Sequence, residues 1–159
     1  MNKTVNTKFK LLALLLALIM SLSLAACQMP ESDGKGDTAD AGKMTLVLAG
    51  DETVVHEVDL DELDVTNGLV SILDYLKTQG KLDYKITGGY LDKVGELENN
   101  AQTGEYIYIY TSVAEDADVS QYATTVEYEG QTLTSSGVGA ADMHIEADAV
   151  IYIGLIVWG

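Results

Sequence analysis

The fold is decided by the stretch 68-GLVSILDYLKTQG-80, which carries the clearest periodic pattern in the chain. Apolar side chains recur there at i, i+3, i+4 and i+7, namely Leu69, Ile72, Leu73 and Leu76. This spacing places them in one stripe along a helix, which can cover one face of a sheet. Thr66 or Asn67 is positioned to cap the start of the helix, and Gly80 is positioned to end it.

Strands are predicted on both sides of this helix. Before it, residues 44–49 and 53–60 flank a Gly-Asp-Glu turn and predict a hairpin. After it, further strands are expected at residues 82–87, 90–94, 105–113, 125–128, 132–133 and 150–158. A hairpin, one helix and then several strands indicate an α+β fold, in which the helix packs on a mostly antiparallel sheet.

Residues 1–26 have the features of a bacterial lipoprotein signal peptide. Three lysines precede an apolar run over residues 11–26, and the run ends in Leu24-Ala25-Ala26-Cys27. Small residues before a cysteine fit a signal-peptidase site, and the run is shorter than the roughly 20 residues of a spanning helix. We therefore expect cleavage before Cys27, acylation of Cys27, and a lipid anchor on the extracytoplasmic face of a bacterial cell membrane. In the alternative, an ordinary secretory signal, the cysteine would be incidental.

The rest of the chain divides into a tether and one domain. Residues 28–43 are small, polar and acidic, so residues 27–43 are expected to form a disordered tether that carries the acylated cysteine. Residues 44–159 are enough for a single domain.

Charge excludes several classes of partner. The chain has a formal net charge of −16, and loss of residues 1–26 would remove three of its nine lysines and no acid. A protein this acidic is repelled by nucleic acid and by anionic lipid headgroups, so membrane attachment would depend on the anchor. The chain has no arginine, which disfavours phosphorylated or strongly anionic ligands.

A tyrosine-rich strand is the most suggestive candidate for a binding surface. Tyr106, Tyr108 and Tyr110 alternate with two isoleucines, so the tyrosines share one face of the strand and the isoleucines the other. If the isoleucines face the helix, the tyrosines look outward, with Tyr90 nearby, and contact a ligand or partner. The alternative is a half-buried face whose hydroxyls reach water. The last strand is apolar on both faces, so both are expected to be covered.

Neither catalysis nor a metal centre has a sequence signature. His56 and His144 are the only histidines, and neither lies in a His-Glu-x-x-His motif. The acidic stretch from Asp116 to Glu127 has the length of a calcium loop, but Gln121 stands where such a loop requires glycine. A looser calcium site among the acidic loops remains an alternative to a solvated acidic surface. We therefore expect a protein that is not an enzyme.

The order of several short motifs resembles a known family. The motifs are the helix start 68-GLVSILDYL-76, the strands 89-GYLDKVG-95 and 104-GEYIYIY-110, the element 138-VGA-140, the turn 146-EAD-148 and the strand start 150-VIY-152. Together they are similar to the C-terminal β-domain of transcobalamin and intrinsic factor, and to bacterial versions of that domain, many of which are lipoproteins. The resemblance implies a β-grasp-like fold over residues 44–159 and, as one ligand, cobalamin. The chain differs in Ala147, in lacking a tryptophan beside Tyr106, and in having Thr111-Ser112 after the aromatic strand.

Two functions are consistent with these features. The first is a non-enzymatic surface lipoprotein that binds a cobalamin-like or other small ligand. The second is an adhesion or protein-interaction module of the cell envelope. In the vitamin carriers the ligand lies between this domain and a helical domain, which this sequence does not contain.

Overall fold

The described part of the chain folds into two sheets and a helix. The structure, a computed structural model, describes residues 41–61 and 63–158. Its elements are β1 (Lys43–Ala49), β2 (Thr53–Asp59), α2 (Gly68–Thr78), β3 (Tyr84–Thr87), β4 (Tyr90–Val94), β5 (Leu97–Glu98), β6 (Glu105–Thr111), β7 (Thr125–Tyr128), β8 (Gln131–Ser135) and β9 (Val150–Val157). The predicted signal peptide and Cys27 lie outside the described residues, and β1 begins at the last residue of the predicted tether.

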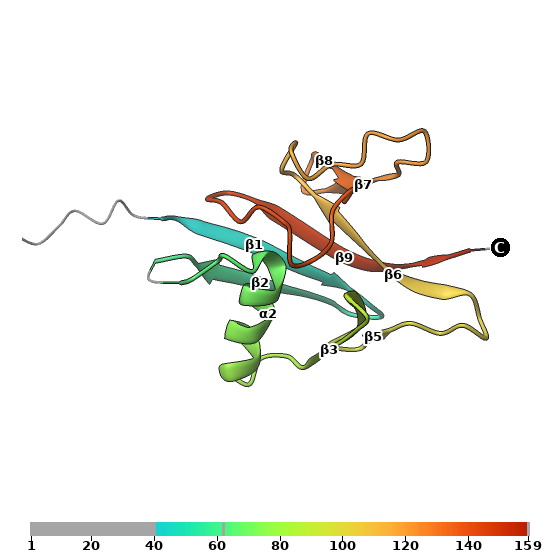
Figure 1. Ribbon diagram of the computed structural model, residues 1–159, viewed down its shortest axis with the longest axis horizontal. Coiled ribbons are helices and arrows are strands. Elements are labelled where there is room, and N and C mark those ends of the chain that lie inside the picture. The colour runs from blue at the N-terminus through green and yellow to red at the C-terminus, as the bar shows by residue number, and fades with distance from the viewer. Residues whose placement is uncertain (1–40, 62, 159) are drawn as a thin grey trace, which may run out of the picture. The chain divides into compact units, whose positions relative to one another are not determined.

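The larger sheet has its earliest and latest strands at its centre. The strand order is β2-β1-β9-β6-β8-β7, and β3, β4 and β5 form a separate small sheet. β1 and β9 run parallel, whereas the other neighbouring strands of the larger sheet are antiparallel. Figure 1 shows β9 between β1 and β6, with α2 beside the β1–β2 hairpin. The predicted α+β fold, with one helix against a mostly antiparallel sheet, is confirmed for the described residues.

The helix stripe forms the centre of the core. All four of its predicted apolar side chains are fully buried, and they join a cluster with alternate residues of β1 and β9, including Met44, Leu46, Ile151 and Ile153. Each such side chain contributes about 1.5–3 kcal/mol on burial. Ile107 and Ile109 of β6 also pack against this cluster, which confirms that the isoleucine face of β6 meets the core.

Among the described residues, no helix is long and apolar enough to cross a membrane.

The two ends of α2 are held differently. At its end, Gly80 has a positive φ of 67°, its N–H donates to the Lys77 carbonyl, and the Lys81 N–H donates to the Leu76 carbonyl. These two bonds form a Schellman motif, so the predicted stop at Gly80 is confirmed. At its start, Asn67 occupies the capping position, but its side chain makes no capping bond. Instead, the Leu69 N–H donates to the carbonyl of Ala140 at 2.8 Å, which ties the helix to a distant loop.

Strand β9 is covered along only part of its length. Ile151 and Ile153 are fully buried between the helix and the sheet. Toward its end, Val157 is 69% exposed and the next residue, Trp158, is 60% exposed. The prediction that both faces of the last strand are covered is therefore wrong at Val157, whereas Trp158, next to the end of the sequence, was expected to be only partly buried.

Candidate functional site: a groove at the edge of strand β6

An open groove of about 640 Å³ runs beside β6. Its walls come from the β3–β4 hairpin, β6, the loop after β8 and the end of the chain: Gly89, Tyr90, Leu91, Asn99, Tyr106, Ile107, Tyr108, Ile109, Ser136, Gly137, Val138, Gly139, Ala140 and Trp158. Four consecutive residues of β6, which belong to both faces of the strand, line it, and because the two faces of a strand meet at its edge, the groove follows that edge. Its volume falls within the range of small-ligand sites, roughly 300–1,000 Å³.

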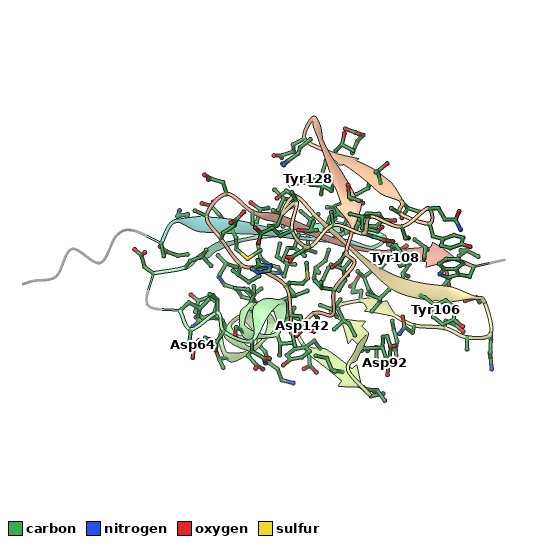
Figure 2. The ribbon with its side chains drawn as sticks, turned by 45° about the horizontal axis from the view of Figure 1, so that its top comes forward. Asp64, Asp92, Tyr106, Tyr108, Tyr128 and Asp142 are labelled. Carbon is green, nitrogen blue, oxygen red and sulfur yellow. The ribbon has the colours of Figure 1, made fainter. Side chains whose placement is uncertain are left out.

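Aromatic side chains form much of the groove surface. Tyr90 is 80% exposed and Tyr106 is 39% exposed, while the Tyr108 and Trp158 rings pack edge to face with their centroids 6.4 Å apart. Figure 2 labels Tyr106 and Tyr108 along the same ribbon, strand β6. Rigid aromatic rings provide contact area at low entropic cost. This end of the protein therefore presents a preformed aromatic surface.

The position of Tyr90 follows from a tight turn. β3 ends at Thr87 and β4 begins at Tyr90, and the two intervening glycines, Gly88 and Gly89, have φ values of 60° and 88°. Two central residues with positive φ are the requirement of a type I′ hairpin turn, and glycine meets it without strain. The turn fixes Tyr90 at the first position of β4, beside the groove.

Successive residues of β6 direct their backbone N–H and C=O groups toward opposite edges of the strand. Two hydrogen bonds mark the ends of the ladder between β6 and β9. The Trp158 N–H donates to the Gly104 carbonyl, and the Ser112 N–H donates to the Val150 carbonyl. In this register, the even-numbered residues of β6 direct their backbone N–H and C=O groups toward β9. The odd-numbered residues therefore direct their N–H and C=O groups toward the opposite edge. Glu105 pairs there with Asn100, and Thr111 lies opposite Thr134 of β8.

On this edge, between Glu105 and Thr111, two hydrogen bonds lie on either side of a short stretch of backbone that is not paired. The Ile107 N–H donates to the side-chain oxygen of Asn99 at 2.6 Å, and the Ile109 carbonyl accepts the Ser136 N–H at 2.8 Å. In the part of the chain that the structure describes, the Ile107 carbonyl and the Ile109 N–H have no hydrogen-bond partner. These two groups point out from the same edge, between Asn99 and Ser136, both of which line the groove.

The loop after β8 is held by its own hydrogen bonds. Gly137 N–H donates to the Asp116 carbonyl at 2.7 Å, and the Ser136 hydroxyl bonds to the Val138 carbonyl at 3.0 Å. The Ala140 carbonyl is the one that receives the Leu69 N–H at the start of α2. This wall of the groove is thus tied to the helix and to the 114–118 turn.

The groove lining contains no charged side chain. The lining residues with polar side-chain groups are the three tyrosines, Asn99, Ser136 and Trp158. Such a surface favours an uncharged ligand that offers apolar area and a few hydrogen bonds.

Three of the four predicted contact tyrosines meet in this groove, and one does not. Tyr90, Tyr106 and Tyr108 line it, whereas Tyr110 is only 8% exposed. The Tyr110 ring packs between those of Tyr108 and Tyr152, at centroid distances of 5.6 and 6.0 Å. The expectation that Tyr110 looks outward is therefore wrong, because other rings cover its end of the strand.

Other residues of the groove were not predicted from the sequence. Trp158 and the 136–140 loop reach it only because β9 and β8 flank β6, and no local pattern reveals that pairing. Asn99 follows β5 in an unremarkable polar segment, and its role appears only in its bond to Ile107. The even spacing of Tyr152 and Trp158 places both on one face of the last strand, but it does not show that this face adjoins the tyrosines of β6.

The acidic loop considered for calcium is engaged in other contacts. Asp116 is completely buried, and its carboxylate accepts the His144 backbone N–H and contacts the His144 ring. Glu127 accepts the Thr132 hydroxyl across the β7–β8 hairpin. Within residues 41–61 and 63–158, no three histidine, cysteine, aspartate or glutamate side chains gather to hold a metal ion.

A smaller cleft of about 230 Å³ lies beside β2. It is lined in part by His56, Lys81 and Glu52. The His56 Nε2 atom is buried without a hydrogen-bond partner among the described residues, and burial, then the nearby Lys81 charge, lowers the pKa of His56. Neutral imidazole is thus favoured there.

Comparison with known proteins finds similarity to solved structures. No family model and no curated protein matches the chain. Among solved structures, it is similar to a chain from Ruminococcus gnavus ATCC 29149, whose crystal structure is described as that of "a putative metal binding protein". The match covers 74% of this chain and 99% of that chain, with 12% sequence identity and a TM-score of 0.48.

Proposed function

We propose that this protein is a non-enzymatic binding domain of a bacterial surface lipoprotein, and that its ligand occupies the groove beside β6. The observation that carries the proposal is an uncharged, aromatic groove in a strongly acidic chain. Tyr90, Tyr106 and Trp158 remain exposed there, although large aromatic side chains usually contribute more when they are buried. Exposed aromatic residues gathered on a rigid edge are typical of recognition surfaces.

Cobalamin is one ligand to test, because the sequence resembles the transcobalamin β-domain. The groove offers a corrinoid aromatic contacts and backbone hydrogen bonds along its edge. Its lining holds no histidine or other side chain suited to bind cobalt. The groove would therefore contact the outer groups of cobalamin and not its cobalt ion. The described residues supply only one surface for this ligand.

The sole tryptophan of the sequence gives a direct assay. Because Trp158 lines the groove, a ligand there should change its fluorescence. We would titrate the purified protein with cyanocobalamin and with blocked uncharged peptides, and confirm each fluorescence change by equilibrium dialysis. At least one of these probes should bind.

Matched variants distinguish the groove from the rest of the surface. The double variant Tyr90→Ser, Tyr106→Ser should lose about tenfold or more in affinity, which corresponds to the usual effect of removing interface aromatics. The control is Tyr122→Ser, because Tyr122 is 70% exposed and lies outside the groove lining. Failure of every probe to bind, or equal binding by the double variant and the wild type, would contradict the proposed function.

A further inference from the structure

We infer that the ligand class is an extended peptide, which adds one strand residue to the open edge of β6 opposite Tyr108. This inference rests on the proposed function and specifies what the groove recognises.

The two unpaired backbone groups are arranged as they are on a strand edge that can accept a further strand. The Ile107 carbonyl and the Ile109 N–H lie on either side of Tyr108 and face the same edge. In a parallel ladder, one residue of the added strand donates its N–H to the first group and accepts from the second. A single peptide residue therefore satisfies both groups at once, as in other cases of strand addition.

The flanking bonds limit the length of the pairing. Asn99 already binds the Ile107 N–H, and Ser136 already binds the Ile109 carbonyl. A peptide can thus pair with the edge over one residue only, and its neighbouring residues must depend on side-chain contacts. The aromatic rings of Tyr106 and Trp158 are available for those contacts.

The opposite wall allows a backbone to approach closely. Gly139 and Ala140 line the groove and present little or no side chain there, and Gly89, where an added Cβ would meet no atom within 4 Å, does the same on the hairpin side. Small residues at a site permit a second main chain to come near.

The charges in and around the groove indicate which peptide residues would bind. The groove itself is uncharged, so the central residues of the peptide should be uncharged. Around it the protein is acidic: Glu105 precedes Tyr106, and the Asp142 carboxylate lies next to Gly139. Among the described residues, neither acid forms an ion pair with a lysine, whereas Lys85 and Lys93 are each paired with an acid. A peptide with lysines at its two ends therefore complements the site.

The probe is a library of peptides in which five varied uncharged residues lie between lysines at the two ends. The peptides are acetylated at the N-terminus and amidated at the C-terminus. Trp158 fluorescence selects the tightest member. Each of its central amides is then methylated in turn. Methylation at one position should lower affinity about tenfold or more, because it removes the hydrogen bond to the Ile107 carbonyl, while methylation of the two adjacent residues should have less than about a threefold effect.

Amide hydrogen exchange at β6 gives a second measurement that needs no variant. In the free protein, the Ile109 amide should exchange faster than the Tyr108 and Tyr110 amides, which face β9. The bound peptide should slow exchange at Ile109 at least tenfold and leave Tyr108 unchanged. Replacing the terminal lysines of the peptide by glutamates should weaken binding about tenfold at low salt.

The outcomes separate this inference from the proposed function. A library without any binder, a methylation series without a sensitive position, or unchanged exchange at Ile109 would each overturn the peptide assignment. Equal binding of the glutamate peptide would also overturn it as stated. If cyanocobalamin nevertheless binds and is lost in the Tyr90→Ser, Tyr106→Ser variant, the proposed function holds while the peptide inference fails.

Discussion

Asp116 and His144 form a pair in which the imidazole Nδ1 lies 2.6 Å from one oxygen of a completely buried carboxylate. The other carboxylate oxygen accepts the His144 backbone N–H at 2.8 Å. Because the Asp116 carbonyl also receives the Gly137 N–H, one residue joins the segment around His144 to a wall of the groove.

This pair predicts a pH-dependent stability. The hydrogen bond to Asp116, and then the charge of Asp116, raises the pKa of His144 above its ordinary value of 6.5. Because the folded protein holds this proton more tightly than the unfolded chain, the stabilisation is complete below about pH 6.5 and is lost as the pH rises through the raised pKa. The denaturation midpoint of His144→Gln should therefore fall further below that of the wild type at pH 5.5 than at pH 8.5. A difference that does not vary with pH would show that the ring charge contributes nothing.

The helix stripe predicts a large loss from a single truncation. Leu73 is fully buried, so Leu73→Ala should lower the free energy of unfolding by about 2–5 kcal/mol, as measured by urea denaturation. Gln79→Ala at the exposed end of the helix serves as the control and should change stability by less than about 0.5 kcal/mol. A loss below about 1 kcal/mol for Leu73→Ala would mean that the stripe is not core.

The tyrosines of β6 should divide into two kinds. Tyr110→Ser should lower stability by about 3 kcal/mol, since the ring is buried between two others. Tyr106→Ser should cost less than about 1 kcal/mol, because Tyr106 is partly exposed. Urea denaturation of both variants tests the division, and equal losses would argue against it. A variant with all three tyrosines replaced is therefore unsuitable for binding studies.

Gly68 at the start of α2 should not tolerate a side chain. Its φ is +55°, and a Cβ there would lie 2.8 Å from the Ala140 and Met143 carbonyl oxygens. Gly68→Ala should lower stability by about 2–5 kcal/mol, which combines the left-handed backbone and the steric overlap. Gly88→Ala is the matched control, because its φ of +60° is similar and no atom lies within 4 Å of the added Cβ. Thermal unfolding should show a loss of only about 1–2 kcal/mol for the control.

Membrane attachment is predicted to depend on one atom, the Cys27 sulfur. Cys27→Ser removes the acylation site, and the acidic remainder of the chain has no affinity for anionic headgroups. In fractionated cells, the variant should leave the membrane fraction while the wild type stays there. Retention of the variant in that fraction would contradict the lipoprotein prediction.

The parts of the fold that could be predicted are those encoded by neighbouring residues. The β1–β2 hairpin, the stripe from Leu69 to Leu76 and the isoleucine face of β6 each follow from spacing within a short window. The insertion of β9 between β1 and β6 could not be predicted, because no local pattern specifies which distant strands pair. That single placement determines that Trp158 joins the groove.

The same limit explains the errors at the candidate site. Alternation correctly placed Tyr106, Tyr108 and Tyr110 on one face, but it could not show that the Tyr152 ring covers Tyr110. Nor could it show that Asn99 would bind the β6 edge and leave part of it open, because that depends on how the small sheet meets the large one.

The parallel pairing of β1 with β9 has a kinetic consequence. Thr45 lies opposite Val150, so nearly the whole domain must form a closed loop before the centre of the large sheet exists. Contacts this distant in sequence slow folding, which we expect to take milliseconds to seconds. Until β9 arrives, β1 and β6 each have an unpaired apolar edge, and such edges favour association between chains. Chains in which β9 has not yet paired should therefore be the most prone to aggregation.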